Sequence, residues 1–165
     1  MAEAAVKKKT GGLAGVIAGQ TEICTVGKEG LGLTYRGYSI ADLAEHACFE
    51  EVAFLLIYGQ LPNEQELNDY QQRLISLRGI PAELATVLEL IPKDAHPMDV
   101  LRTGCSFLGN IEPEHSSHDA FNIADRLIAI FPSILTYWYR FHQGERIDTR
   151  TDELSMAGHF LRLLT

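Results

Sequence analysis

The sequence predicts a mainly α-helical fold with a small β-hairpin near its N-terminus. Apolar residues recur at intervals of three and four through most of the chain after residue 39, which is the spacing of one helix face. Ser, Asn, Asp and Pro stand where these helices would begin, and Gly stands where some would end. The β-rich stretches are short and precede residue 39.

The composition suits one globular domain of 165 residues, with 46% hydrophobic and 22% charged residues. A net charge of -8 argues against a nucleic-acid or anionic-membrane surface, because both need clustered Lys and Arg. No stretch approaches the ~20 apolar residues of a membrane helix, so we expect neither nucleic acid nor membrane as a partner. Cys24, Cys48 and Cys105 are odd in number and widely spaced, which favours reduced structural thiols and a cytoplasmic location.

Residues 1–12 are expected to form a flexible N-terminal arm. The lysines at residues 7–9 are its one dense basic cluster, and the Gly and Ala residues around them favour a solvated tail. A signal peptide is the weaker alternative, since the apolar run is short, interrupted by Gly and lacks an A-x-A cleavage pattern. Residues 21–26 and 32–35 then predict a hairpin around the turn GKEGLG.

Helices are expected through the rest of the chain. Ser39 caps a helix over residues 39–47, and a second helix over 50–58 ends at Gly59. Within this second helix, residues 52–58 carry no charge, so it either lies deep in a helical core or packs against a partner chain. Asn63 and Glu66 predict a capping box, which opens a helix over 63–78 closed by Gly79.

The remaining helices follow the same signals. Pro81 and Pro97 lie at the starts of helices over 82–90 and 98–109. The longest helix is expected over 119–142, with a bend near Ile128 because Pro132 removes one ladder bond. A last helix starts near residue 153 and shows no cap, Gly or polar run after Leu164, which is expected of an incomplete chain. Residues 110–118 and 143–152 are polar surface loops.

The first of these loops holds the densest group of potential metal ligands. Its spacing matches no zinc or di-iron motif, and the segment is typical of a loop before a helix. We therefore favour a solvated loop with an Asp or Ser helix cap over a metal site. The residues concerned are Glu112, Glu114, His115, His118 and Asp119.

Other polar residues do not form a catalytic set. His96 precedes Pro97 and is expected to bond locally at a helix start rather than act as a base. Arg36, Arg102 and Arg140 stand singly, and such arginines usually satisfy helix ends or carboxylates. No Ser stands in G-x-S-x-G, no Cys in a reactive setting, and the glycines of GKEGLG lack the phosphate-loop pattern. The residues by themselves thus indicate a soluble helical domain.

Five strings carry a family resemblance: TEICTVGKEGLGLTYRGYSIADLAEH, FEEVAFLLIYGQLP, LRGIP, HPMDVLRTG and YWYRFHQGERI. In order and spacing they resemble the N-terminal part of the citrate synthase family, and within it the methylcitrate branch. The resemblance covers residues 12–165. It implies a mostly helical fold in which a large and a small domain close over the substrates, and in which two subunits form a homodimer. Residues 13–165 would be the N-terminal part of the large helical domain, incomplete at the C-terminus.

The resemblance also implies an activity for the complete enzyme. The family condenses an acyl-CoA with oxaloacetate through an enol and then hydrolyses the thioester, so acyl-CoA is a substrate and no cofactor is implied. Propionyl-CoA is the expected acyl donor, giving 2-methylcitrate and CoA. Acetyl-CoA with an ordinary citrate synthase activity stays open, as does a non-catalytic helical interaction module.

No active-site residue is carried over from the family. Its catalytic strings, of the K-H-G-G-A-N and G-H-P-x-Y types with a later Asp, do not occur in this sequence. His159 stands in GHFLRLLT, which belongs to an earlier helix of the family, and receives no catalytic role. The expectation is therefore no catalytic, cofactor-binding or metal residue, and no activity of this chain by itself.

Overall fold

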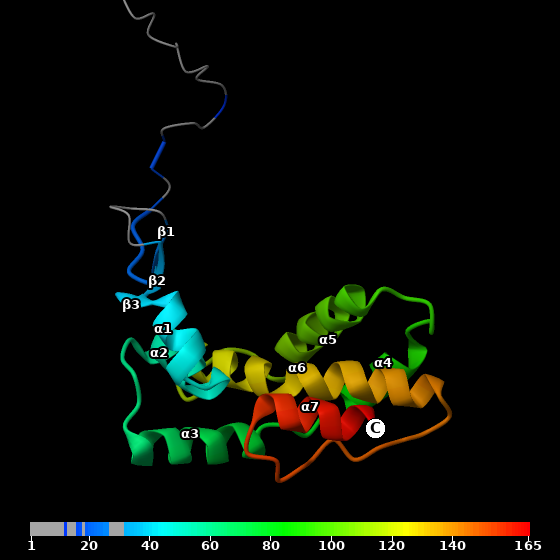
Figure 1. Cartoon of the computed structure of the whole chain (residues 1–165). Coiled ribbons are helices and arrows are strands. Elements are labelled where there is room, and N and C mark those ends of the chain that lie inside the picture. Colours follow the sequence, from blue (N-terminus) through cyan, green and yellow to red (C-terminus); the bar gives the residue numbers. More distant parts are fainter. Residues whose placement is uncertain (1–11, 13–15, 18, 27–31) are drawn as a thin grey trace, which may run out of the picture.

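The computed structural model describes residues 12, 16–17, 19–26 and 32–165. A small antiparallel sheet at one end leads into a run of helices (Figure 1), which confirms the predicted mainly helical class. The strands are β1 (Cys24–Val26), β2 (Leu33–Tyr35) and β3 (Tyr38–Ser39). The helices are α1 (Ile40–His46), α2 (Phe49–Tyr58), α3 (Glu64–Ser76), α4 (Ala82–Leu90), α5 (Pro97–Ile111), α6 (Ala120–His142) and α7 (Met156–Leu164).

The sheet has the order β1-β2-β3, so the predicted hairpin is present and is extended by a third strand. The sequence reading missed β3, because its two residues follow β2 after only Arg36 and Gly37. Both turn residues have positive φ, 49° for Arg36 and 91° for Gly37, which is easy for Gly and strained for Arg. The Arg36 guanidinium donates to the Leu56 carbonyl at 3.0 Å, and this bond to the last turn of α2 helps hold the strained turn. The predicted arm and most of the GKEGLG turn lie outside the described residues.

Most helix starts lie where local signals predicted them. Ser39 caps α1, the Asn63–Glu66 capping box opens α3, and the Asp119 carboxylate accepts the Asn122 N–H at 3.0 Å to cap α6. Gly59 closes α2 in the left-handed conformation, with φ 93°. The last helix begins at Met156 rather than near residue 153, because Ser155 supplies its cap. These starts depend on contacts within four residues, which explains why sequence alone predicts them.

The end of α3 differs from the prediction. The helix stops at Ser76, before the expected closure at Gly79. The backbone carbonyls of Leu77 and Gly79 instead accept bonds from the Arg126 guanidinium of α6. A long-range side chain thus takes over the carbonyls that further helical turns would have used, and no local signal announces this.

The first core lies between α4, α5 and the C-terminal half of α6. Its buried side chains are apolar or aromatic and include no charged group. Gly104 of α5 allows a close approach, since a Cβ there would lie 3.0 Å from a methyl carbon of Ile134. The α6 helix continues through Pro132, and the bend expected near Ile128 stays a prediction. The buried members are Leu84, Leu88, Val100, Leu108, Ile130, Ile134, Tyr137 and Trp138.

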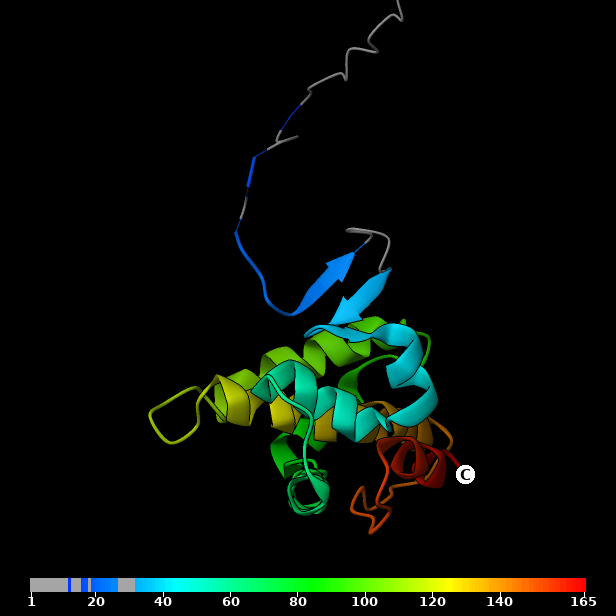
Figure 2. The same ribbon diagram turned by 60° about the vertical axis from the view of Figure 1, so that its left-hand side comes forward.

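The second core joins α2, α3, the middle of α6 and α7, which lies along α6 in both ribbon views (Figures 1 and 2). Its buried members are Ala53, Tyr70, Leu74, Ala129 and Met156. Charged residues are buried next to this core, namely Glu50, Arg78, Asp125 and Arg126. The two clusters therefore differ at their borders: the charged groups beside the second core are buried, whereas Glu89, which accepts a bond from Tyr137 of the first core, is only partly buried.

The apolar helix α2 is covered on one side only by the described part of the chain. Leu55 is fully buried and Ala53 is 8% exposed, whereas Phe49 is 57% and Tyr58 38% exposed. The helix therefore packs on the second core and still presents apolar surface. In the described residues, no helix combines the length and the apolar character that crossing a membrane requires.

Candidate functional site

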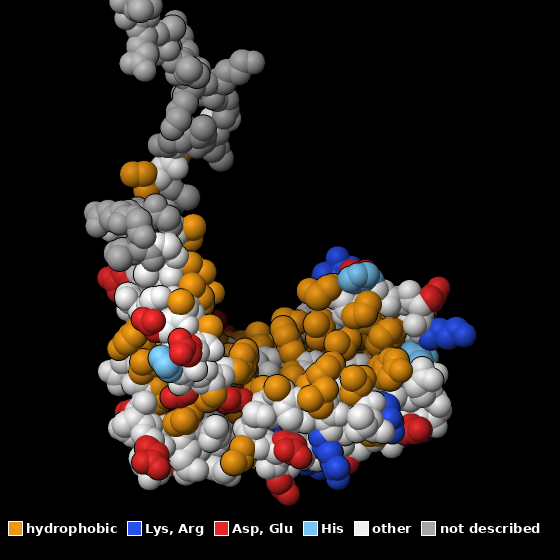
Figure 3. All heavy atoms as spheres, viewed as in Figure 1, with side chains coloured by type: hydrophobic (Ala, Val, Ile, Leu, Met, Phe, Trp, Pro, Cys, Tyr) orange, Lys and Arg blue, Asp and Glu red, His pale blue; other side chains and the backbone are white. Residues whose placement is uncertain are grey.

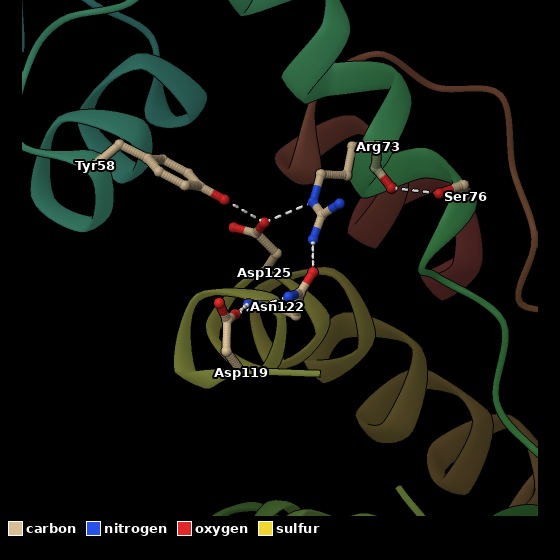
Figure 4. A network of polar contacts seen from close by, with 6 residues as sticks. All are labelled: Tyr58, Arg73, Ser76, Asp119, Asn122 and Asp125. Atoms are coloured by element: carbon tan, nitrogen blue, oxygen red, sulfur yellow. Dashed lines mark hydrogen bonds and ion pairs between the residues drawn. The ribbon is translucent and has the colours of Figure 1, made fainter. Parts of the chain in front are cut away.

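Three helices meet at the buried carboxylate of Asp125 in α6 (Figure 4). Its Oδ2 accepts the Tyr58 hydroxyl of α2 at 2.6 Å and the Arg73 Nε–H of α3 at 2.7 Å. Asp125 is fully buried while the Arg73 side chain is 42% exposed, so the ion pair runs from the interior to the surface. Arg73 also donates from Nη2 to the Asn122 side-chain oxygen at 2.5 Å.

Local bonds fix both ends of this network. The Asn122 side-chain amide donates to Asp119 Oδ1 at 2.7 Å, and the same oxygen caps α6. At the other end the Ser76 hydroxyl donates to the Arg73 carbonyl at 2.6 Å. Arg73 and Asn122 each bond two partners and Asp125 Oδ2 accepts two bonds, so these three side chains hold one another in place.

A cleft of about 530 Å³ opens beside the network. Its aromatic wall has Phe54 and Tyr70 edge to face at 5.3 Å, and Tyr58 and Phe121 stacked at 5.8 Å between ring centroids. Its polar lining residues are Glu66, Asp69, Arg73, Asp119 and Asn122. The cleft thus combines an aromatic wall with charged groups, the two kinds of lining that ligand sites use.

The electrostatics of the cleft favour binding over proton transfer. Burial raises the pKa of Tyr58 well above its usual value, and the bond to the Asp125 carboxylate adds to this. Burial and the same negative charge also raise the pKa of Tyr70. Both hydroxyls therefore stay protonated at neutral pH and do not act as bases, and that of Tyr58 donates to Asp125. The Arg73 pKa is raised by its bond to Asp125, so this guanidinium stays charged and committed to the ion pair.

The residues that sequence reasoning considered for a metal site are not brought together. Glu112 forms a bidentate ion pair with Arg126 at 2.8 and 2.9 Å, and Asp119 is the helix cap. His115 and His118 exchange backbone bonds across a small turn, with their ring centroids 5.7 Å apart. Among the described residues, no group of three or more His, Cys, Asp and Glu side chains is arranged to hold a metal ion. The predicted Asp helix cap is confirmed, and Glu114 stays exposed in the loop.

The other candidates take local structural roles. His96 Nδ1 accepts the Met98 N–H at 3.1 Å at the start of α5, as expected. The three single arginines bond helix ends or carboxylates: Arg36 the Leu56 carbonyl, Arg102 the Asp99 carboxylate at 3.1 Å, and Arg140 the carboxylate of Glu145 and the Leu164 carbonyl. Cys24, Cys48 and Cys105 are free thiols.

His159 belongs to α7 and lies on the buried face of this helix, away from the cleft. Its Nε2 is 3.0 Å from the Ser133 hydroxyl oxygen and its Nδ1 2.9 Å from that of Thr151. Burial, with the nearby positive charge of Arg78, lowers the pKa of His159 to about 4. The ring is therefore neutral at physiological pH and enclosed by the fold, which makes it a packing residue of this chain.

Sequence reasoning did not find the Asp125 network. The signal was present in part, because Asp125 and Arg126 interrupt an otherwise apolar helix stretch, and charged residues at such positions are seldom buried without partners. The partners themselves lie 52 and 67 residues away in sequence, in α3 and α2. Only the packing of the three helices brings them together.

A sequence model described as citrate synthase, C-terminal domain, matches residues 12–165. The chain belongs to the citrate synthase family. Among curated relatives, the 2-methylcitrate synthase of Shewanella oneidensis is 59% identical over 160 residues, which is 96% of this chain and 43% of the relative. The 2-methylcitrate synthase 1 of Corynebacterium glutamicum is 36% identical, covering 99% of this chain and 43% of its own. The citrate synthase of Acidithiobacillus ferridurans is also 36% identical, covering 93% and 42%.

Solved structures agree with this family. The citrate synthase of Thermotoga maritima superposes with a TM-score of 0.78 at 34% identity, covering 93% of this chain and 40% of that one. The enzyme of Pyrobaculum aerophilum gives 0.78 at 30%, covering 92% and 41%. The chain thus spans about 40% of the length of these citrate synthases. Its helices and their packing are those of a citrate synthase over that part.

Proposed function

We propose that this chain is the N-terminal portion of a 2-methylcitrate synthase, in which residues 13–165 form much of the large helical domain. The complete enzyme would condense propionyl-CoA with oxaloacetate and water to give 2-methylcitrate and CoA, in the cytoplasm and without a cofactor. The observation that carries the proposal is the 59% identity over 160 residues to the Shewanella oneidensis 2-methylcitrate synthase. At 36% identity the two activities are no longer separated, since the Corynebacterium glutamicum 2-methylcitrate synthase 1 and the Acidithiobacillus ferridurans citrate synthase are equally similar to this chain.

The side chains support a scaffold role for this portion. The tyrosines of the cleft are kept protonated, Arg73 is tied to Asp125, and His159 is buried and neutral. A condensation of this kind needs a base to form an enol and donors that stabilise the developing negative charge. Tyr58, Arg73 and His159 are engaged in bonds between elements of the fold, so we assign the chemistry to segments that follow in the complete enzyme.

A homodimer is part of the same proposal, and the apolar surface supports it. Hydrophobic side chains gather over the hollowed face between α1 and α5 (Figure 3). Large apolar residues are also exposed on several helices, with Leu90 at 79%, Met98 at 63% and Leu161 at 58%. An apolar surface of this extent is typical of association. In the complete enzyme it would be covered by following helices and by a second subunit.

A chimera tests whether this portion can serve as the scaffold of a 2-methylcitrate synthase. Residues 12–165 would replace the matching segment of the Shewanella oneidensis enzyme, and CoA release would be followed with oxaloacetate and either propionyl-CoA or acetyl-CoA. We expect turnover with higher kcat/KM for propionyl-CoA. Turnover close to that of the parent enzyme would support the proposal, and a folded but inactive chimera would contradict the scaffold assignment.

The second candidate is a non-catalytic helical interaction module, which the same exposed apolar surface favours. Light scattering of the purified 165-residue chain, together with denaturant unfolding, separates the two. A monodisperse monomer with one cooperative transition would favour the module. Aggregation, or a molten state that binds hydrophobic dyes, would favour a portion of a larger enzyme.

A further inference from the structure

The buried polar cluster beneath α7 is centred on His159 and has an unusual set of partners. The imidazole is fully buried, and both of its nitrogens face hydroxyls, Ser133 of α6 at 3.0 Å and Thr151 of the preceding segment at 2.9 Å. A hydroxyl can donate or accept, and a neutral imidazole needs one donor and one acceptor. The two hydroxyls therefore satisfy the hydrogen bonding of a neutral imidazole. A protonated imidazole would find no carboxylate among its bonding partners.

The nearest charge makes protonation less favourable. The fully buried Arg78 guanidinium donates to the Thr151 and Glu153 carbonyls at 3.0 and 2.6 Å. No carboxylate of the described residues lies within ion-pair distance of it. A protonated His159 would thus be a second buried cation beside the first, which is costly in a medium of low dielectric.

The charged groups around the cluster come from three directions. Glu50 of α2 accepts the Met156 N–H at 2.7 Å, Arg78 follows α3, and Asp152 and Glu153 precede α7. The α6 helix contributes hydroxyls, from Ser133 and Thr136, which are buried. The acidic groups act on Arg78 through space, and burial lowers the Arg78 pKa in spite of them. None of these acids bonds a ring nitrogen of His159.

We propose that α7 is an acid-released helix, held against α6 and α2 while His159 is neutral and loosened when this ring is protonated. The buried face of α7 consists of Met156, His159 and Leu163, so the titrating ring stands between its two apolar anchors. Loosening α7 withdraws Met156 from the second core. The first core contains no residue of α7 and stays closed.

The direction and size of the effect follow from linkage. The ordinary pKa of His is 6.5 and the folded value for His159 is about 4. The free energy that holds α7 against the rest of the fold is therefore unaffected by His159 protonation above pH 6.5. It falls progressively as the pH drops from 6.5 toward 4. Between about pH 7.5 and about pH 5, the opening constant of α7 is expected to rise roughly thirtyfold.

Hydrogen exchange followed by mass spectrometry tests this in the chimera that carries residues 12–165 within the Shewanella oneidensis enzyme. After correction for intrinsic exchange rates, peptides from α7 should lose about thirtyfold in protection between the two pH values, while α5 peptides change little. In His159→Gln the side chain cannot titrate, so α7 protection should become independent of pH. His142→Gln is the matched control, since His142 contacts the Ile91 carbonyl near the first core. It should behave as the wild type does.

Three results would overturn the acid-released helix. These are equal α7 protection at both pH values, an undiminished acid effect in His159→Gln, or simultaneous opening of α5 and α7. Should His159→Gln fail to fold, an NMR titration of the wild-type imidazoles still decides. A His159 resonance that stays neutral until α7 opens supports the inference, and one that titrates near 6.5 in the docked state rejects it.

Discussion

The two cores share helix α6 but are stabilised differently. The buried cluster of the first core, between α4, α5 and the C-terminal half of α6, is apolar, and at its edge the Tyr137 hydroxyl donates to the partly buried Glu89 carboxylate at 2.8 Å. Around the second core, Asp125 joins α2, α3 and α6, and Arg126 bonds the carbonyls that follow α3. The C-terminal half of α6 thus packs mainly through apolar side chains with a few polar bonds at the edge, such as Tyr137 to Glu89, whereas its first half carries two buried charged residues that bond distant segments. The second kind of contact fixes relative positions more sharply and depends on charge state.

The largest expected effect comes from removing side-chain volume in the first core. Leu88 is fully buried there, so Leu88→Ala should lower the free energy of unfolding by about 3 kcal/mol through lost burial and the cavity left behind. Because no charge is involved, the loss should be the same at about pH 7.5 and about pH 5. Urea denaturation at both values measures it. A loss that depends strongly on pH would mean that the two cores are not distinct in kind.

The next effect comes from removing a buried negative charge beside the second core. Asp125→Asn keeps the side-chain size but removes the ion pair with Arg73 and the acceptor of the Tyr58 hydroxyl. Removing one partner of a buried pair costs about 3–5 kcal/mol, and the 42% exposure of Arg73 lets water relieve part of it. We expect a loss of about 2 kcal/mol in urea denaturation.

An exposed ion pair in the first region is the matched control for this substitution. Arg102 and Asp99 lie 3.1 Å apart with side chains 78% and 57% exposed. Asp99→Asn should therefore change the unfolding free energy by less than about 0.5 kcal/mol. If Asp125→Asn is equally mild, the buried carboxylate does not hold the three helices together.

A smaller pair of effects compares two glycines, one beside each core. Gly59 ends α2 with φ 93°, so Gly59→Ala should cost about 1 kcal/mol through backbone strain. Gly109 lies in α5 with open space around a would-be Cβ, so Gly109→Ala should stabilise by roughly 0.5 kcal/mol. Thermal melting followed by circular dichroism should therefore shift in opposite directions. Shifts of the same sign would contradict the assigned roles.

Another small effect concerns a local cap. Asn63 caps α3 by accepting the Glu66 N–H at 3.0 Å, and Glu66 accepts the Asn63 N–H at 2.8 Å. Asn63→Ala removes the first bond and should cost about 1 kcal/mol or less. The same melting experiment measures it, with the neighbouring Gln65→Ala as an exposed comparison. A cost equal to that of Asp125→Asn would be inconsistent with the greater weight given to the buried network.

The two regions also differ in how far the sequence predicted them. Caps such as Ser39, Asn63 and Asp119 and the glycine stop at Gly59 lie within a few residues of what they bond, so the starts of the helices followed from local patterns. The apolar stripe that contains Leu84 and Leu88 predicted the buried face of α4. The helices of the first core and the buried face of α4 could therefore be predicted from the sequence.

Less of the second region could be predicted, because its bonds join residues that are far apart in the sequence. The early end of α3 depends on Arg126, and the cleft depends on Tyr58, Arg73 and Asp125 coming from three helices. The third strand depends on Arg36 accepting a positive φ with help from the Leu56 carbonyl. Periodicity describes which face of a helix is apolar, but not which distant polar group will meet it.

The central claim is that these residues form an enzyme scaffold without its catalytic groups. Its most direct test is CoA release by the purified 165-residue chain, given oxaloacetate with propionyl-CoA or acetyl-CoA. A thiol reagent reports free CoA, and a blank without acyl-CoA corrects for the three free cysteines. We predict no release above the blank with either acyl-CoA. Sustained turnover that requires oxaloacetate would contradict the account.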